Sequence, residues 1–188
     1  ETIGDDLNTL IRQLEIPEGK IIVHANTPSY IGSHVNGFAN MMSGFIKYLS
    51  EKSAVGNGKV GIFPGFVNPG DMHELKRIVK LLGVKYIMFP DTDGTMDTPL
   101  TGHYEIYAKG GTTVEEIREL GSAKHVLALG EITSTLPAMD LKRKCNVDFS
   151  SLPLPMGVEA TDKFVMALSH LSRREVPAEL EVERGQLL

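Results

Sequence analysis

TPSYIGSHVNG, residues 27–37, joins a short apolar run to a long amphipathic helix, and the predicted fold follows from this junction. Residues 20–25 before it are apolar and rich in β-branched side chains, which predicts a buried strand. After it, apolar residues recur every three or four positions, which predicts a helix over 35–49 with Ser33 as its N-cap. Turns between a strand and a helix carry the ligand sites of α/β sheets, so the turn at 27–33, which contains Ser29, is the first candidate site. From spacing alone, the simpler interpretation is that hydroxyls in this turn satisfy backbone groups.

The rest of the chain repeats the alternation of strand and helix. Strand-like runs lie at 21–25, 59–64, 84–90, 125–129 and 152–156. Helical patterns lie at 35–49, 72–82, 114–120, 138–145 and 160–171, with Thr113 and Glu116 at capping-box spacing and Pro137 expected in a first turn. This order predicts an α/β fold, a mostly parallel sheet of about five strands with helices on both faces, in a Rossmann-like arrangement.

Length and composition favour a single α/β domain over 1–188, with 188 residues and 41% hydrophobic content for its core. We expect an N-terminal helix and connector at 1–19, a core at 20–175 and the start of a linking helix at 176–188. The net charge of −5 argues against nucleic acid or an anionic membrane as partner. No apolar run approaches the roughly 20 residues that span a bilayer, and no secretory signal is visible. Cys145 is the only cysteine and cannot form an internal disulfide, which suits the cytoplasm.

DTDGTMD, residues 91–97, follows an apolar run and resembles the first motif of haloacid-dehalogenase-type phosphatases. In that interpretation Asp91 attacks phosphorus and Asp93 acts as acid and base, with Mg²⁺ screening the phosphate. The position after the third predicted strand and the weak later acidic pair, Glu159 and Asp162, count against it. An Asx- and glycine-rich turn is the favoured interpretation.

Other patterns predict no site. Gly32 and Gly37 have the outer spacing of a phosphate loop, but Phe38 and Ala39 stand where Lys and Ser or Thr are required. The six histidines never pair at metal-ligand spacing on one element. Cys145 ends a Lys- and Arg-rich helix and is expected to be a packed or half-exposed thiol.

Residues 25–41, together with ETIGDDLN at 1–8 and ERGQL at 183–187, resemble the β chain of nitrogenase, and the resemblance covers essentially all 188 residues. MFPDT at 88–92 and VEATD at 158–162 are most similar to the iron-only type, although the metal of the parent cofactor (iron alone, vanadium or molybdenum) stays open. Because β chains of the family are longer at both ends, the resemblance implies an internal piece of such a chain.

The resemblance also implies a function. Ser29 matches the serine that gives an oxygen ligand to the oxidised [8Fe-7S] P-cluster, while cysteines, absent here, supply the other ligands. The implied partners are the nitrogenase α chain and the ATP-driven iron protein, and the implied enzyme is an oxidoreductase that reduces dinitrogen to ammonia. The fragment alone is expected to be inactive, to hold no cluster and to self-associate through its N-terminal helix. The alternatives are a cofactor-assembly scaffold of the same superfamily and the phosphatase that uses Asp91 and Asp93.

Overall fold

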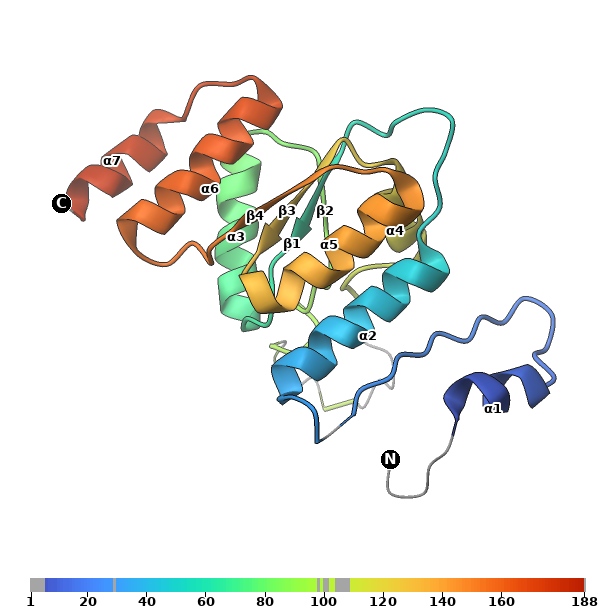
Figure 1. Ribbon diagram of the computed structural model, residues 1–188. Helices are drawn as coiled ribbons and strands as arrows, with labels where there is room; N and C mark the ends of the chain where they lie inside the picture. Colours follow the sequence, from blue (N-terminus) through green and yellow to red (C-terminus); the bar gives the residue numbers. More distant parts are fainter. Residues whose placement is uncertain (1–5, 29, 98, 100–101, 104–108, 188) are drawn as a thin grey trace.

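A computed structural model describes residues 6–28, 30–97, 99, 102–103 and 109–187 of the chain (Figure 1). Within these residues four parallel strands form one sheet in the order β2-β1-β3-β4. The strands are β1 (Val60–Phe63), β2 (Tyr86–Met88), β3 (His125–Leu129) and β4 (Phe149–Leu152). In the register, Val60 lies between Tyr86 and His125, and Val126 lies beside Phe149. The predicted α/β class and parallel sheet are confirmed, with four strands instead of about five.

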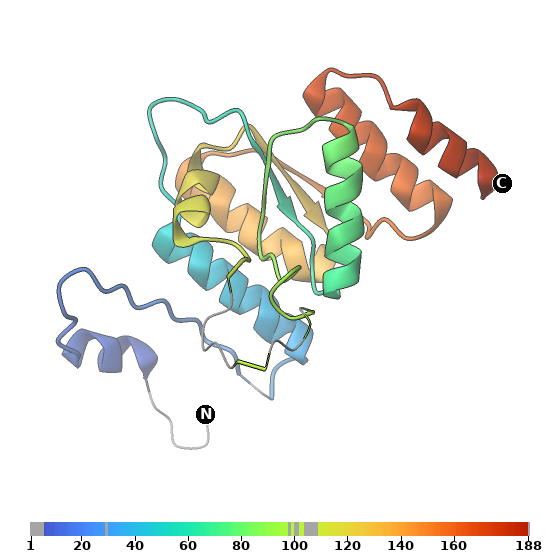
Figure 2. The same cartoon turned by 180° about the vertical axis from the view of Figure 1, so that it is seen from behind.

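Helices cover both faces of this sheet, as Figures 1 and 2 show from opposite sides. The helices are α1 (Leu7–Gln13), α2 (His34–Leu49), α3 (Pro69–Leu81), α4 (Val114–Glu119), α5 (Glu131–Cys145), α6 (Gly157–Ser172) and α7 (Ala178–Gln186), with a 3₁₀ turn at Leu120–Ser122. Helices α2, α4 and α5 pack on one face, and α3 and α6 pack on the other. Helix α1 contributes no buried residue.

The core has two halves, one on each face of the sheet, because successive side chains of a strand point to opposite faces. In β3, Val126 and Ala128 pack against α2, α4 and α5, whereas Leu127 and Leu129 pack against α3 and α6. All four are fully buried. A central parallel strand that is buried on both faces explains why residues 125–129 appear in the sequence as a continuous apolar run.

Two predicted strands were wrong. Residues 21–25 pair with no strand in the described structure, and His24 and Ala25 lie against Gly44 of α2 instead. The fourth strand runs over Phe149–Leu152 and not over 152–156. Pro153 and Pro155 lack the N–H group that a strand ladder needs, so the proline pair ends β4 and forms the loop into α6.

Helix α5 begins seven residues earlier than predicted, at Glu131 directly after Gly130. Pro137 therefore lies inside the helix and not in its first turn, which corrects the prediction. Residues 131–136 show little apolar periodicity, so no helical pattern indicated this first half of α5. The predicted positions of α2, α3, α4 and α6 are confirmed within a few residues, as is the capping box at Thr113 and Glu116.

Candidate functional site

The carboxyl ends of the four strands meet at one edge of the sheet, which we call the carboxyl edge. The loops that follow the strands lie there, and so do the first turns of α2, α3, α5 and α6 (Figure 1). Close packing requires a glycine at Gly65, where φ is +83° and a Cβ atom would stand 2.9 Å from the Leu129 carbonyl oxygen. Parallel α/β sheets place ligand sites at this edge.

Ser29, the first predicted site residue, lies outside the described residues. The residues after it are described, and they show how α2 begins. The Ser33 hydroxyl accepts a hydrogen bond from the Val35 amide (3.3 Å), and the Asn36 side chain accepts one from the Ser33 amide (3.1 Å). Ser33 is therefore the N-cap of α2, as predicted, and the helix does not require Ser29 for capping.

Aromatic contacts hold the first turns of α2 at the carboxyl edge. The Phe66 ring, in the loop after β1, lies edge-on to His34 (5.5 Å between ring centroids) and to Phe38 (5.2 Å). Beside this contact Tyr30 and Ile31 are 83% and 82% exposed, and Phe66 is 57% exposed. The sequence did not indicate Phe66, because a single aromatic residue in a loop has no periodicity.

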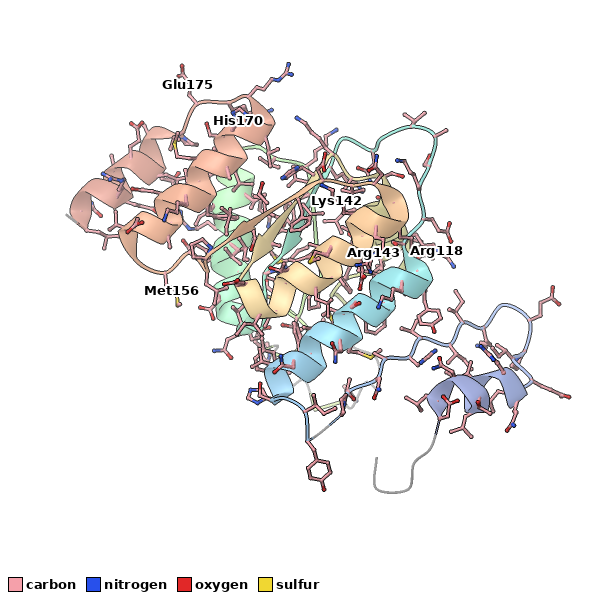
Figure 3. The ribbon with its side chains drawn as sticks, in the orientation of Figure 1. Arg118, Lys142, Arg143, Met156, His170 and Glu175 are labelled. Atoms are coloured by element: carbon pink, nitrogen blue, oxygen red, sulfur yellow. The ribbon has the colours of Figure 1, made fainter. Side chains whose placement is uncertain are left out.

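Met156 is a further apolar side chain at this edge. It lies in the turn before α6, is largely exposed and points away from the body of the molecule (Figure 3). Large exposed apolar side chains gathered in the loops of one edge favour contact with another protein.

Asp91 and Asp93 follow β2, and both pair with Lys76 of α3. The Lys76 Nζ atom lies 2.6 Å from an Asp91 oxygen and 3.0 Å from an Asp93 oxygen, and all three side chains are largely buried. Burial lowers the pKa of Lys76, but hydrogen bonds to the two carboxylates outweigh this and raise it. The hydrogen bond from Lys76 lowers the pKa of Asp93. Lys76 is thus positively charged at neutral pH and forms ion pairs with both aspartates.

The local geometry of residues 91–97 is that of a turn. The Asp91 side chain accepts a hydrogen bond from the Asp93 amide (3.1 Å), and the Thr92 amide and hydroxyl both contact the Met72 sulfur. One Asp91 oxygen thus binds Lys76 and the other accepts the Asp93 amide, which is the arrangement of an Asx turn. Glu159 and Asp162, the predicted later acidic pair, bind Lys163 and Arg184 instead. The contribution of Lys76 was missed because its position on a helix surface gives no sequence signal.

Metal-ligating side chains are scattered in the part of the chain that the structure describes. Within the described ranges no group of three or more His, Cys, Asp or Glu side chains is placed to bind a metal ion. Cys145 is buried, as predicted, and its sulfur lies 3.7 Å from the Ser50 hydroxyl. Iron–sulfur clusters are held by several thiolates, which a chain with one buried cysteine cannot provide.

Comparison with known proteins gives consistent results. A family model described as "Nitrogenase component 1 type Oxidoreductase" matches residues 1–188. The chain is 52% identical to the nitrogenase molybdenum-iron protein beta chain of Clostridium pasteurianum, over 100% of its own length and 42% of that relative. It is 36% identical to the corresponding chain of Azotobacter vinelandii, over 100% of its own length and 38% of the relative. The chain therefore spans about two fifths of the length of these curated relatives.

A solved structure, "Nitrogenase Cp1 at pH 6.5", superposes with a TM-score of 0.95 and 52% identity, over 98% of this chain and 41% of that one. The nitrogenase iron-iron protein beta chain of Rhodobacter capsulatus is 32% identical over 100% of this chain and 42% of the relative. The expected likeness to the iron-only type is thereby corrected, because the molybdenum-iron chains named above share more residues with this chain. None of the described helices is long and apolar enough to cross a membrane.

Proposed function

The chain belongs to the nitrogenase component 1 type oxidoreductase family, and from that premise we propose that it forms part of a nitrogenase β chain. The observation that carries the proposal is its 52% identity, along its whole length, to a molybdenum-iron protein beta chain. In this role the chain belongs to the component that receives electrons from an ATP-driven iron protein and reduces dinitrogen to ammonia. The 188 residues alone are expected to be inactive.

The cofactor of the proposed assembly is the [8Fe-7S] P-cluster, with Ser29 as the only ligand from this chain. When bound, the cluster relays electrons through changes in the oxidation state of its iron atoms. The chemistry of Ser29 supports the assignment, since iron lowers the pKa of a bound hydroxyl and stabilises the alkoxide. The capping of α2 by Ser33 supports it too, because Ser29 is not required for that task.

The proposed partner at the carboxyl edge is the nitrogenase α chain. Tyr30, Ile31 and Phe66 are exposed beside the turn that contains Ser29, and large exposed apolar side chains favour association. A cluster shared between the chains would also have to lie at such a contact. Binding and hydrolysis of ATP are assigned to the iron protein, which agrees with Phe38 and Ala39 at the positions that a phosphate loop needs for Lys and Ser or Thr.

We also assign the protein to the cytoplasm. The single cysteine is a free, buried thiol, so the fold does not depend on an oxidising compartment. An iron–sulfur enzyme of this family would require the same reducing conditions.

Association with an α chain tests the proposal directly. The full-length chain is co-expressed anaerobically with a clostridial nitrogenase α chain, and copurification is quantified. We expect a stable complex that Ile31→Asp weakens at least tenfold, because the substitution buries a charge in the contact. Val55→Asp is the matched control, since Val55 is 76% exposed in the loop before β1, at the opposite edge of the sheet. Equal effects of the two substitutions would contradict the assigned surface.

A further inference from the structure

The segment 24–27 lies along one face of α2, and four α2 residues contact it in order. A Cβ atom on Gly37 would meet the Thr27 Cβ at 3.8 Å, and the Asn40 side-chain amide donates a hydrogen bond to the Asn26 carbonyl oxygen (3.1 Å). A Cβ atom on Gly44 would stand 2.8 Å from the His24 carbonyl oxygen. Tyr48 hydrogen-bonds His24 through its hydroxyl, and the two rings pack at 5.0 Å. Figure 1 shows the segment running beside α2.

The contacts are antiparallel and in register. From Gly37 to Gly44 the helix rises seven residues, about 10.5 Å at 1.5 Å per residue. From Thr27 back to His24 the extended chain covers three residues, about 10 Å at 3.3 Å per residue. The two lengths match, and the contacts follow the helix in order: Thr27 at Gly37, Asn26 at Asn40, Ala25 and His24 at Gly44, and His24 again at Tyr48. The apolar run at 21–25, predicted as a strand, thus has a helix face as its partner.

A cavity of about 430 Å³ beside this contact does not require a ligand. Four of its polar lining side chains, all on α2, have partners: Asn40 binds Asn26, Tyr48 binds His24, and Ser43 and Lys47 both bind the buried Asp140 of α5. A binding site for a polar ligand presents unsatisfied groups, and the described lining offers none among these four. The contacts therefore serve to hold the segment.

We propose that Asn40, Gly44 and Tyr48 form a clamp that positions the turn at the start of α2. By fixing residues 24–27 on the helix, the clamp fixes the two described flanks of the turn and presents Tyr30 and Ile31 in one arrangement to the partner chain. The inference rests on the proposed function for the identity of that partner. Pre-organisation of a contact surface lowers the ordering cost of association, so loss of the clamp slows or weakens binding.

Two glycines of α2 give a matched pair of variants. Replacing a helical glycine by alanine favours the helix, and this benefit applies to both Gly37 and Gly44. At Gly37 the new methyl group makes an ordinary contact with Thr27. At Gly44 it collides with the His24 backbone carbonyl, which cannot move without lifting the segment from α2. The clamp therefore predicts that Gly44→Ala releases the segment and that Gly37→Ala, the same substitution in the same helix, does not.

The experiment measures amide hydrogen exchange in the full-length chain, alone and with the α chain. We expect Gly44→Ala and Asn40→Ala to accelerate exchange at 22–27 at least tenfold and to weaken α-chain binding at least fivefold. Gly37→Ala should change neither quantity. Tyr48→Phe, which removes only the hydroxyl, replaces Gly44→Ala in the test if that variant fails to fold. It should also accelerate exchange at 22–27 and weaken α-chain binding, but by smaller factors.

The outcomes separate the clamp from the proposed function. Equal exchange in Gly44→Ala and Gly37→Ala would show that the segment is not held on α2 and would overturn the clamp. Faster exchange with unchanged α-chain binding would overturn its positioning role. A wild-type chain that binds no α chain would refute the proposed function, while the exchange contrast would still decide whether the clamp exists.

Discussion

Lys76 and Asp91 form a largely buried ion pair of 2.6 Å that joins α3 to the carboxyl end of β2. Asp93 shares the same ammonium at 3.0 Å. Removing Lys76 leaves two carboxylates close together without a compensating charge, which is far more costly than losing a surface ion pair. We predict that Lys76→Met lowers the free energy of unfolding by about 2 kcal/mol. Urea denaturation of the 188-residue chain measures this change.

A triple variant supplies the control for Lys76. Changing Asp91 and Asp93 to asparagine in the Lys76→Met background removes the repulsion, so part of the lost stability should return. If Lys76→Met unfolds at the wild-type urea concentration, the ion pair does not stabilise the turn.

The same pair predicts the absence of phosphatase activity. Both oxygens of Asp91 are engaged, one by Lys76 and one by the Asp93 amide. We expect no Mg²⁺-dependent hydrolysis of p-nitrophenyl phosphate above the buffer control, in the wild type and in Asp91→Asn alike. Turnover that Asp91→Asn abolishes would identify residues 91–97 as a catalytic site.

His125 predicts a pH dependence of stability. Burial in β3 lowers its pKa below the ordinary value of 6.5, and its ring contacts the Ser150 hydroxyl at 2.9 Å. Below pH 6.5 the unfolded chain binds a proton that the folded chain does not, so stability present above pH 6.5 is lost as the pH falls toward the depressed folded pKa. Urea unfolding at pH 7.5 and 5.5 should show this loss, and His125→Gln should reduce it. An identical loss in both proteins would assign the effect to other groups.

Helix α1 predicts self-association of the 188-residue chain. Leu7, Leu10 and Leu14 are 41%, 45% and 56% exposed, and the helix buries none of its residues. Exposed apolar stripes of this kind favour contact between copies. Light scattering at high concentration should show species larger than a monomer, and Leu10→Glu should shift them toward the monomer. A strictly monomeric wild type would refute the prediction.

Most of the fold could be predicted because its core elements have strong periodicity. The continuous apolar run at 125–129 predicts a buried strand, and the apolar stripe at 35–49 predicts a helix; both predictions agree with the structure. The errors occur where tertiary contacts replace local pattern. Residues 21–25 have the composition of a strand. The absence of a side chain at Gly44 lets this segment approach α2, and a contact of this kind between distant residues has no pattern in the sequence. The first half of α5 has no apolar stripe, because it buries the hydroxyl residues Thr133 and Ser134 while Ile132 remains exposed. The Ser134 hydroxyl binds the Phe63 and Leu129 carbonyl oxygens at the ends of β1 and β3.

The candidate site could be predicted less completely. Its location at the carboxyl edge follows from the order of strands and helices. The side chains that determine its chemistry are far apart in sequence. Lys76 lies 15 residues or more from the two aspartates that it neutralises. Phe66 lies in the loop after β1, whereas its partner Phe38 lies on α2. Ser29 itself came from family resemblance, since one serine in a turn has no distinctive spacing.

Replacement of Ser29 by alanine tests the central claim most directly. In the isolated chain we expect a stability change within about 0.5 kcal/mol, as for an ordinary surface residue, because Ser33 caps α2. Ser33→Ala is the matched control and should cost about 1 kcal/mol through loss of the cap.

The decisive measurement is the electron paramagnetic resonance spectrum of the full-length chain assembled anaerobically with its α chain, recorded reduced and oxidised. For Ser29→Ala we expect unchanged iron content, an unchanged reduced spectrum and an altered oxidised spectrum, whereas Ser33→Ala should leave both spectra unchanged. An oxidised Ser29→Ala spectrum identical to that of the wild type would contradict the assignment of Ser29 as a cluster ligand.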